Sequence, residues 1–93
     1  MAWILDQTKK LSINSDNCNY IYVETKTNTI KAVVKSEVNG NDVKLAIGTY
    51  DSPDICIDIL NVLNSHLRRC DFIEMPIDSE HVNFIEEHRT FGS

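Results

Sequence analysis

The 93-residue chain has few glycines and cysteines, and each shortage excludes a class of site. Three glycines cannot supply the phosphate-binding loops G-x-G-x-x-G or G-x-x-x-x-G-K, and neither motif occurs. The G-x-S-x-G motif of serine hydrolases is absent too. The number of cysteines is odd, and no two of them form a C-x-x-C pair. They are widely spaced, at Cys18, Cys56 and Cys70. A secreted disulfide framework and a zinc site are therefore disfavoured.

Long hydrophobic runs are also missing. No segment approaches the roughly 18 apolar residues that a membrane span needs. The first residues, MAWILDQTKK, lack the basic start and long apolar stretch of a signal peptide. We therefore expect a cytoplasmic protein without a membrane partner.

Positive charge is in short supply. Nine Lys and Arg against fourteen Asp and Glu give a net charge of −5. This balance repels a phosphate backbone, so we expect no nucleic-acid partner. A small phosphorylated ligand held by two or three local arginines remains compatible with it.

What the chain does have is enough apolar sequence for one small domain. Its hydrophobic content is 42%, which is typical of a globular core and too high for a disordered tail. The length predicts a single domain over residues 1–93. A core this thin would be stabilised further by oligomerisation.

The first half of the chain reads as short strands separated by polar turns. Alternation and β-branched residues predict a hairpin over Trp3–Ile13 and strands over Tyr20–Glu24, Thr29–Val38 and Val43–Tyr50. Asn39-Gly40 is a strong hairpin signal between the last two. In the strand that starts at Thr29, one face is expected to be buried and the other, with Lys31, Val33 and Lys35, to be mostly wet.

Two helices are predicted in the second half. Asp51 or Ser52 can cap a helix that has Pro53 at its first position and ends near Arg68. Its apolar stripe is broad enough for two packing partners and contains Cys56, Ile59, Leu60, Leu63 and Leu67. An extended segment up to Pro76 and a second helix capped by Ser79 follow. These elements predict an α+β fold: an antiparallel sheet of four to five strands, a long helix and a short C-terminal helix.

No catalytic or metal site is visible in this pattern. His66, His81 and His88 lack the spacing of a zinc motif, and surface positions are expected for them. No local motif brings a nucleophile to a base. We expect neither enzymatic activity nor a cofactor.

Arginine and aromatic side chains are the candidates for ligand binding. Arg68, Arg69 and Arg89 are the only arginines, and arginines at element ends can clamp a phosphate. Their alternative roles are capping of a helix C-terminus for the first two and an exposed tail for Arg89. Trp3, Tyr50, Phe84 and Phe91 could stack on a base or simply pack in the core. For Trp3 the apolar strand context predicts burial.

The order of several short motifs resembles a known family. A Trp near the N-terminus is followed by LSIN-x-DN, IYV, TIKAVV, IGTY-x-S running into a helix, and IEMP. This layout, from Trp3 to Pro76, is similar to small proteins from phages and prophages of Gram-positive bacteria, and in particular to the first-described family of Thoeris anti-defence sponges. One departure is Pro-Asp-Ile at residues 53–55, where the family usually has Glu-Glu-Ala or similar.

The resemblance implies a function. Proteins of that family assemble as dimers or higher oligomers and sequester a cyclic ADP-ribose isomer, and some hold cyclic oligonucleotides, without cleaving the ligand. It implies that Arg89, Thr90 and Phe91 contact phosphate and base at a subunit boundary. Arg68, Arg69 and Trp3 are further ligand-binding candidates because of their residue types. The alternative is a small interaction module that inhibits or regulates a host protein.

Overall fold

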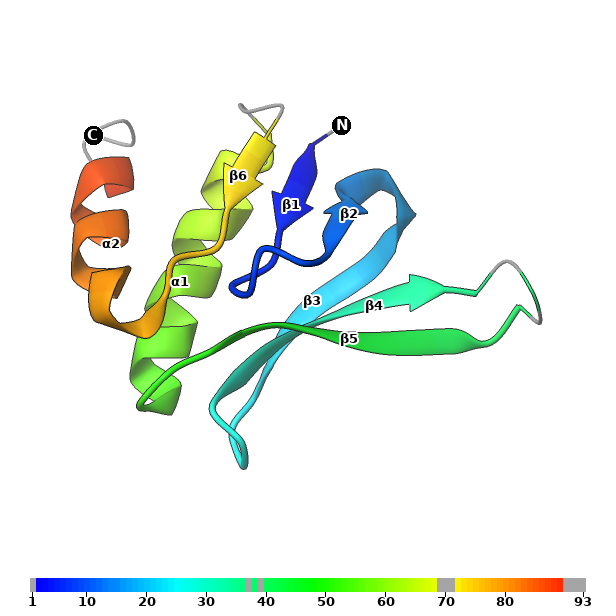
Figure 1. The fold of residues 1–93 in the computed structure, drawn as a ribbon, viewed down its shortest axis with the longest axis horizontal. Coiled ribbons are helices and arrows are strands. Elements are labelled where there is room, and N and C mark those ends of the chain that lie inside the picture. Colours follow the sequence, from blue (N-terminus) through cyan, green and yellow to red (C-terminus); the bar gives the residue numbers. More distant parts are fainter. Residues whose placement is uncertain (1, 37, 39, 69–71, 90–93) are drawn as a thin grey trace.

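The structure is a computed structural model that describes residues 2–36, 38, 40–68 and 72–89. It has the expected α+β composition (Figure 1). In chain order the elements are β1 (Trp3–Leu5), β2 (Ser12–Asn14), β3 (Cys18–Glu24), β4 (Thr29–Lys35), β5 (Asp42–Thr49), α1 (Pro53–His66), β6 (Phe72–Glu74) and α2 (His81–Arg89). Two short 3-10 helices cover Ser15–Asn17 and Asp78–Glu80.

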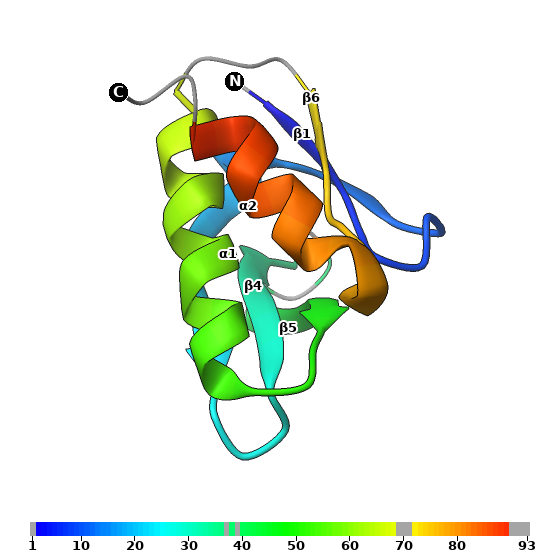
Figure 2. The same cartoon turned by 90° about the vertical axis from the view of Figure 1, so that its left-hand side faces the viewer.

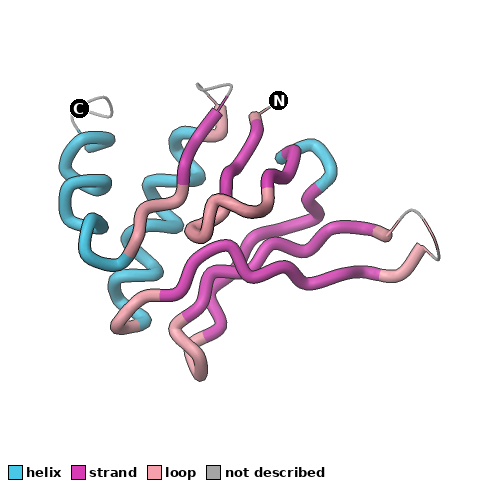
Figure 3. The backbone as a smooth tube through the Cα atoms, viewed as in Figure 1, coloured by secondary structure: helices cyan, strands magenta, loops and turns pink. Residues whose placement is uncertain are grey.

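The prediction of one antiparallel sheet of four to five strands is wrong. The described strands form two three-stranded sheets, with orders β2-β1-β6 and β3-β4-β5 (Figure 3). The 3-10 helix at Ser15–Asn17 separates β2 from β3, so the N-terminal hairpin does not join the long sheet. The other edge of β1 pairs in parallel with β6. No local turn signal can reveal a parallel pair between segments so far apart in sequence.

The long sheet is the antiparallel meander that the sequence predicts. β4 pairs with β3 on one side and with β5 on the other. The β4–β5 turn contains Gly40 at φ +73°, a left-handed conformation that glycine adopts without steric cost. Its partner in the predicted turn, Asn39, lies outside the described residues. Val33 is fully buried, so the expectation that its face is mostly wet is wrong at this position.

Helix α1 forms where capping and periodicity agree. Ser52 is the N-cap and its hydroxyl accepts a hydrogen bond from the Ile55 amide, with Pro53 at the first position. The helix ends at His66, two residues before the predicted end. The buried members of its stripe are Cys56, Ile59 and Leu63. As expected from the broad stripe, α1 packs against two partners: the sheet strands β3 and β4, and α2 (Figure 2).

The C-terminal segment also begins differently from the prediction. The residues before Pro76 are extended, as expected, and form β6. Ser79 does not cap α2, because it lies inside the 3-10 helix Asp78–Glu80, which runs directly into α2. The N-cap position of that 3-10 helix is Ile77, which has no side chain able to accept a hydrogen bond. Phe84 is the residue that anchors α2 in the core.

A small polar hub joins the two sheets to the C-terminal segment. The side-chain nitrogen of Gln7 donates to the Thr49 and Pro76 carbonyls, and its side-chain oxygen accepts a hydrogen bond from the Thr49 amide. The Tyr50 hydroxyl donates to the same carbonyl at 2.7 Å. Burial raises the pKa of Tyr50, so the phenol stays a donor. Pro76 is thereby fixed against the end of β5.

The turn between β1 and β2 is organised by one buried carboxylate. Asp6 is 6% exposed and accepts hydrogen bonds from the amides of Lys10 and Leu11 and from the Thr8 hydroxyl. Burial alone would raise the pKa of Asp6, but these hydrogen bonds outweigh it and the pKa is lowered. The ionised form is therefore part of the folded turn.

We predict that Asp6→Asn lowers the free energy of unfolding at pH 7 by about 1 kcal/mol, because charge-assisted hydrogen bonds become neutral ones. A carboxylate with a lowered folded-state pKa contributes stability above its unfolded-state pKa and loses it as the pH falls through the folded-state value. Urea titrations at pH 7 and near pH 3 should therefore show a smaller acid-induced loss in the variant than in the parent. Asp58→Asn, on the exposed side of α1, is the control; an equal effect of both substitutions contradicts this role for Asp6.

Within the described residues, neither helix is long and apolar enough to cross a membrane.

Candidate functional site

Trp3 is exposed, contrary to the predicted burial. It is 44% exposed and lies on the outer face of the short sheet β2-β1-β6. Ile4 points the other way, into the core, together with its cross-strand partners Ile13 and Ile73. Trp3, Ile4 and Leu5 are all apolar. The sequence therefore does not show which side of this strand faces the core, because that inference needs apolar and polar residues to alternate.

Trp3 lines a hollow of about 710 Å³ between the outer face of the short sheet and the far end of the β4–β5 hairpin. Its volume lies in the range of small-molecule sites, about 300–1,000 Å³. The remaining wall is polar except for Ile13 and Val34. It contains Ser12, Asn14, Asp16, Asn17, Asn19, Lys35, Ser36 and Gly40.

The floor of this hollow, which we call the Trp3 hollow, is held by local hydrogen bonds. The Ser15 amide donates to the Ala2 carbonyl at 2.7 Å, and the Ala2 amide donates to the Ser15 hydroxyl at 3.0 Å. The Asn14 side chain caps the 3-10 helix by accepting from the Asp16 amide. These bonds fix the 3-10 helix beside Trp3, so its polar side chains are presented at a constant position.

Two contacts position the opposite wall. Asn19 donates from its side-chain amide to Asp42 at 3.2 Å, which ties the start of β3 to the start of β5. Ser36 and Asn41 close the β4–β5 turn by a backbone hydrogen bond. The Lys35 ammonium has no ion pair with any described residue. It is the one cation among the described lining residues of the Trp3 hollow.

This set of groups suits a ligand that has both a flat ring and polar substituents. An exposed indole can stack on a base. Amides and hydroxyls can both donate to and accept from ribose and base edges. Lys35 can attract one phosphate group, while Asp16 repels phosphate and suits sugar hydroxyls. The described lining includes neither histidine nor cysteine.

A second hollow, of about 520 Å³, lies between β6 and α2. It is lined mainly by apolar residues of β6 and the segment after it, and by Phe84, with His66 and Asn83 among its polar residues. Lys9 lies at this hollow and forms an ion pair with Glu74 at 2.8 Å. Because its cation is already paired, this hollow is less suited to an anionic ligand than the Trp3 hollow.

No arginine is among the described residues that line the Trp3 hollow. Arg68 is exposed just beyond α1 and lines neither hollow. Arg89 ends α2, and its side chain lies outside the description. Arg69, Thr90 and Phe91 also lie outside the described residues. A phosphate clamp built from these side chains therefore stays a prediction.

The other candidates have packing roles. Tyr50 and Phe84 are 4% and 7% exposed and belong to the core cluster, so neither presents a stacking surface. The Cys56 thiol is fully buried and donates to the Asn28 carbonyl, and burial raises its pKa, as expected for an inert thiol. Among the described residues, no group of three His, Cys, Asp or Glu side chains could hold a metal ion.

Sequence reasoning missed most of the lining of the Trp3 hollow. Ser12 and Ile13 belong to the predicted hairpin, and the Asn- and Ser-rich residues between that hairpin and the strand at Tyr20 are predicted only as a polar turn. Such clusters are typical of turns, so composition alone could not separate a turn from a binding wall. The available signal is position: Asn14 ends the strand that pairs with β1, directly opposite Trp3, and Asn17 and Asn19 follow it.

Comparison with known proteins adds no relative: no protein-family model, no curated protein and no solved structure matches this chain.

Proposed function

We propose that this chain is a phage-encoded anti-defence protein that binds and sequesters a cyclic ADP-ribose isomer, or a related cyclic nucleotide immune signal, without cleaving it. The motif resemblance supplies the ligand class. The observation that carries the proposal is the exposed Trp3 indole at the edge of a hollow that contains three asparagines and Lys35, which has no ion pair with a described residue.

Every part of such a ligand except its second phosphate has a matching group in the Trp3 hollow. Adenine can stack on Trp3. The ribose hydroxyls can exchange hydrogen bonds with Asn14, Asn17 and Ser12. One phosphate can approach Lys35, and the second needs another cation.

A second copy of the chain would supply that cation and cover the open side. We propose a homodimer or higher oligomer in the infected host cell's cytoplasm, with Arg68, Arg69 and the C-terminal residues Arg89, Thr90 and Phe91 at the boundary. A site shared across a two-fold axis needs no deep pocket in either protomer.

We predict that Trp3→Ala weakens binding of cyclic ADP-ribose isomers by about tenfold or more, because the stacking surface is lost. Trp3→Phe should retain most of the affinity. Thermal-shift titrations measure the binding, and mass spectrometry of ligand released by heating tests whether it is unchanged. Recovery of altered ligand would establish an enzyme, and equal affinity of Trp3→Ala and the parent would remove Trp3 from the site.

The alternative function is an interaction module that regulates a host protein. It is favoured by Phe72, which is 54% exposed and pairs beside Trp3 on the same face of the short sheet. Two adjacent exposed aromatics are typical of a protein contact. Absence of any nucleotide-induced thermal shift, with retained inhibition of a host protein that is lost in Phe72→Ala, would favour this alternative.

A further inference from the structure

The outer face of the long sheet is separate from the Trp3 hollow and has a composition of its own. Cross-strand pairing puts Val33 between Tyr20 on β3 and Lys44 on β5, and puts Tyr22 beside Lys31. Glu24 follows Tyr22 at period two on the same face. We call these six residues the tyrosine–lysine face. The core, α1 and the short sheet lie on the other side of β3-β4-β5, and no helix or strand of the described residues lies over this face (Figures 1 and 2).

The tyrosines shield one apolar residue and leave aromatic surface in water. Val33 is fully buried although it is not part of the core cluster, so the side chains of its own face cover it. The rings of Tyr20 and Tyr22 have centroids 5.8 Å apart at an interplanar angle of 47°. Tyr20 remains 55% exposed. It therefore offers a supported aromatic surface to a ligand.

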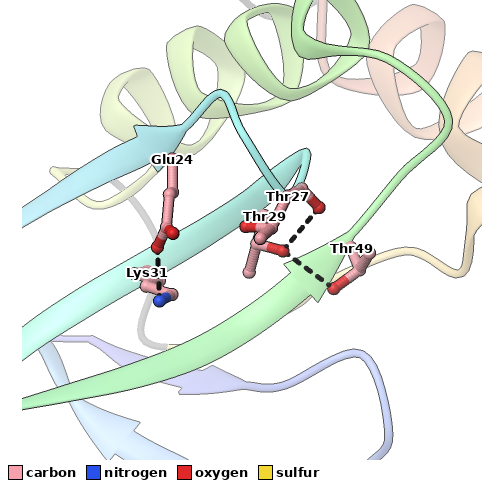
Figure 4. Close-up of polar contacts among 5 residues, drawn as sticks. All are labelled: Glu24, Thr27, Thr29, Lys31 and Thr49. Carbon is pink, nitrogen blue, oxygen red and sulfur yellow. Dashed lines mark hydrogen bonds and ion pairs between the residues drawn. The ribbon is translucent and has the colours of Figure 1, made fainter.

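Cations outnumber the carboxylates around this aromatic pair. Glu24 forms an ion pair with Lys31 (Figure 4). The bond from Lys31 lowers the pKa of Glu24, and the charges of Lys44 and Lys26 add to this effect. Three lysines thus surround Glu24. Asp42, two residues before Lys44 on the same face of β5, is a second carboxylate, so the lysines still exceed the carboxylates by one. Threonines complete the end of the face: the Thr29 and Thr49 hydroxyls share a hydrogen bond, and Thr29 also donates to the Thr27 carbonyl (Figure 4).

The net charge of −5, from which no nucleic-acid partner is expected, is the sum of two halves of opposite sign. Residues 1–50 contain all six lysines and five acidic residues, a net charge of +1. Residues 51–93 contain nine acidic residues and three arginines, a net charge of −6. The acidic excess therefore belongs to the half of the chain that includes both helices, while the long sheet lies in the other half. An anion that approaches the outer face of that sheet meets the lysine-rich half first.

We propose that the tyrosine–lysine face binds single-stranded nucleic acid. Exposed bases stack on Tyr20, and Lys31, Lys44 and Lys26 attract the phosphates. Aromatic side chains on an open sheet with flanking cations are the combination that single strands require, since a duplex keeps its bases stacked inside. The surface is distinct from the Trp3 hollow, so this proposal and the proposed sequestration of a cyclic nucleotide can fail independently.

The test is fluorescence anisotropy with labelled DNA and RNA single strands of about twelve nucleotides, a length within the usual site sizes. Three phosphate contacts predict that the logarithm of the binding constant falls with the logarithm of salt concentration with a slope of about −2. Lys44→Ala should reduce that slope by about 0.7. Tyr20→Ala should weaken binding by about tenfold, whereas Tyr20→Phe should retain it.

Two further variants separate binding from stability. Glu24→Gln removes the carboxylate that neutralises Lys31 and should tighten binding by about threefold, although it removes an ion pair from the fold. Lys10→Ala, in the β1–β2 turn, removes the same charge elsewhere and should leave binding unchanged. Circular dichroism verifies that each variant is folded.

Several results would overturn the proposal. One is unchanged anisotropy at low salt for both single strands. Another is equal binding by the parent and the Tyr20→Ala and Lys44→Ala variants. A preference for duplex over single strand would also contradict it. Binding of poly-glutamate in place of either oligonucleotide would reassign the face to an acidic protein partner.

Discussion

Leu63→Ala is expected to lower the free energy of unfolding by about 3 kcal/mol, because it removes buried methyl groups and leaves a cavity in the core. Leu63 has no exposed surface and lies in the α1 stripe that faces the core cluster. Domains of this size have only about 5–15 kcal/mol of stability in total. One substitution in α1 should thus remove a large fraction of it, and urea titration followed by far-UV circular dichroism measures the loss.

Ile57 provides the matched control on the same helix. It is 45% exposed, so Ile57→Ala should cost less than about 1 kcal/mol, since little apolar surface is returned to water and alanine is the better helix former. Similar losses in the two variants would show that the buried side of α1 is assigned incorrectly.

Gly48→Ala should be the second most damaging substitution, with a loss of about 2–3 kcal/mol from overpacking. A β-carbon at this position would lie 2.7 Å from the Tyr50 hydroxyl oxygen and 2.8 Å from the ring carbon Cε2. The ring cannot move aside easily, because Tyr50 is buried and its hydroxyl is held by the Pro76 carbonyl. Thermal unfolding of the variant tests this.

Gly40→Ala separates a steric clash from backbone strain. Gly40 has φ +73° but nothing within 4 Å of an added β-carbon. Its substitution should therefore cost only about 1 kcal/mol, the penalty of a left-handed alanine. Combining Gly48→Ala with Tyr50→Phe removes the closest contact and should recover part of the loss. A Gly48→Ala variant no less stable than Gly40→Ala contradicts the close approach of Tyr50.

The elements that the sequence predicts well are those fixed by neighbouring residues. Ser52 and Pro53 set the start of α1, and the buried members of its stripe set the side that packs. The hairpin over Trp3–Ile13 and the meander through the Gly40 turn follow from alternation and turn chemistry. These signals act over a few residues, which is why they can be read without the fold.

What could not be predicted depends on contacts between distant segments. The parallel pairing of β1 with β6 divides the strands into two sheets and exposes Trp3 on one of them. Val33 lies on the predicted face but is buried, because Tyr20 on the adjacent strand is its cross-strand partner. Of the candidate site residues that the structure describes, only Trp3 lines the Trp3 hollow, and the asparagines of the hollow come from a segment that the sequence predicts to be a turn.

The proposed ligand site can be tested without labels because Trp3 is the only tryptophan in the chain. Its emission should be sensitive to any ligand that stacks on the indole. Titration with cyclic ADP-ribose isomers is predicted to quench or shift this emission in a saturable way, with the ligand chemically unchanged afterwards. Emission that stays constant across the isomers and the cyclic dinucleotides, at protein concentrations where thermal shifts are also absent, would contradict the assignment of the Trp3 hollow as a nucleotide site.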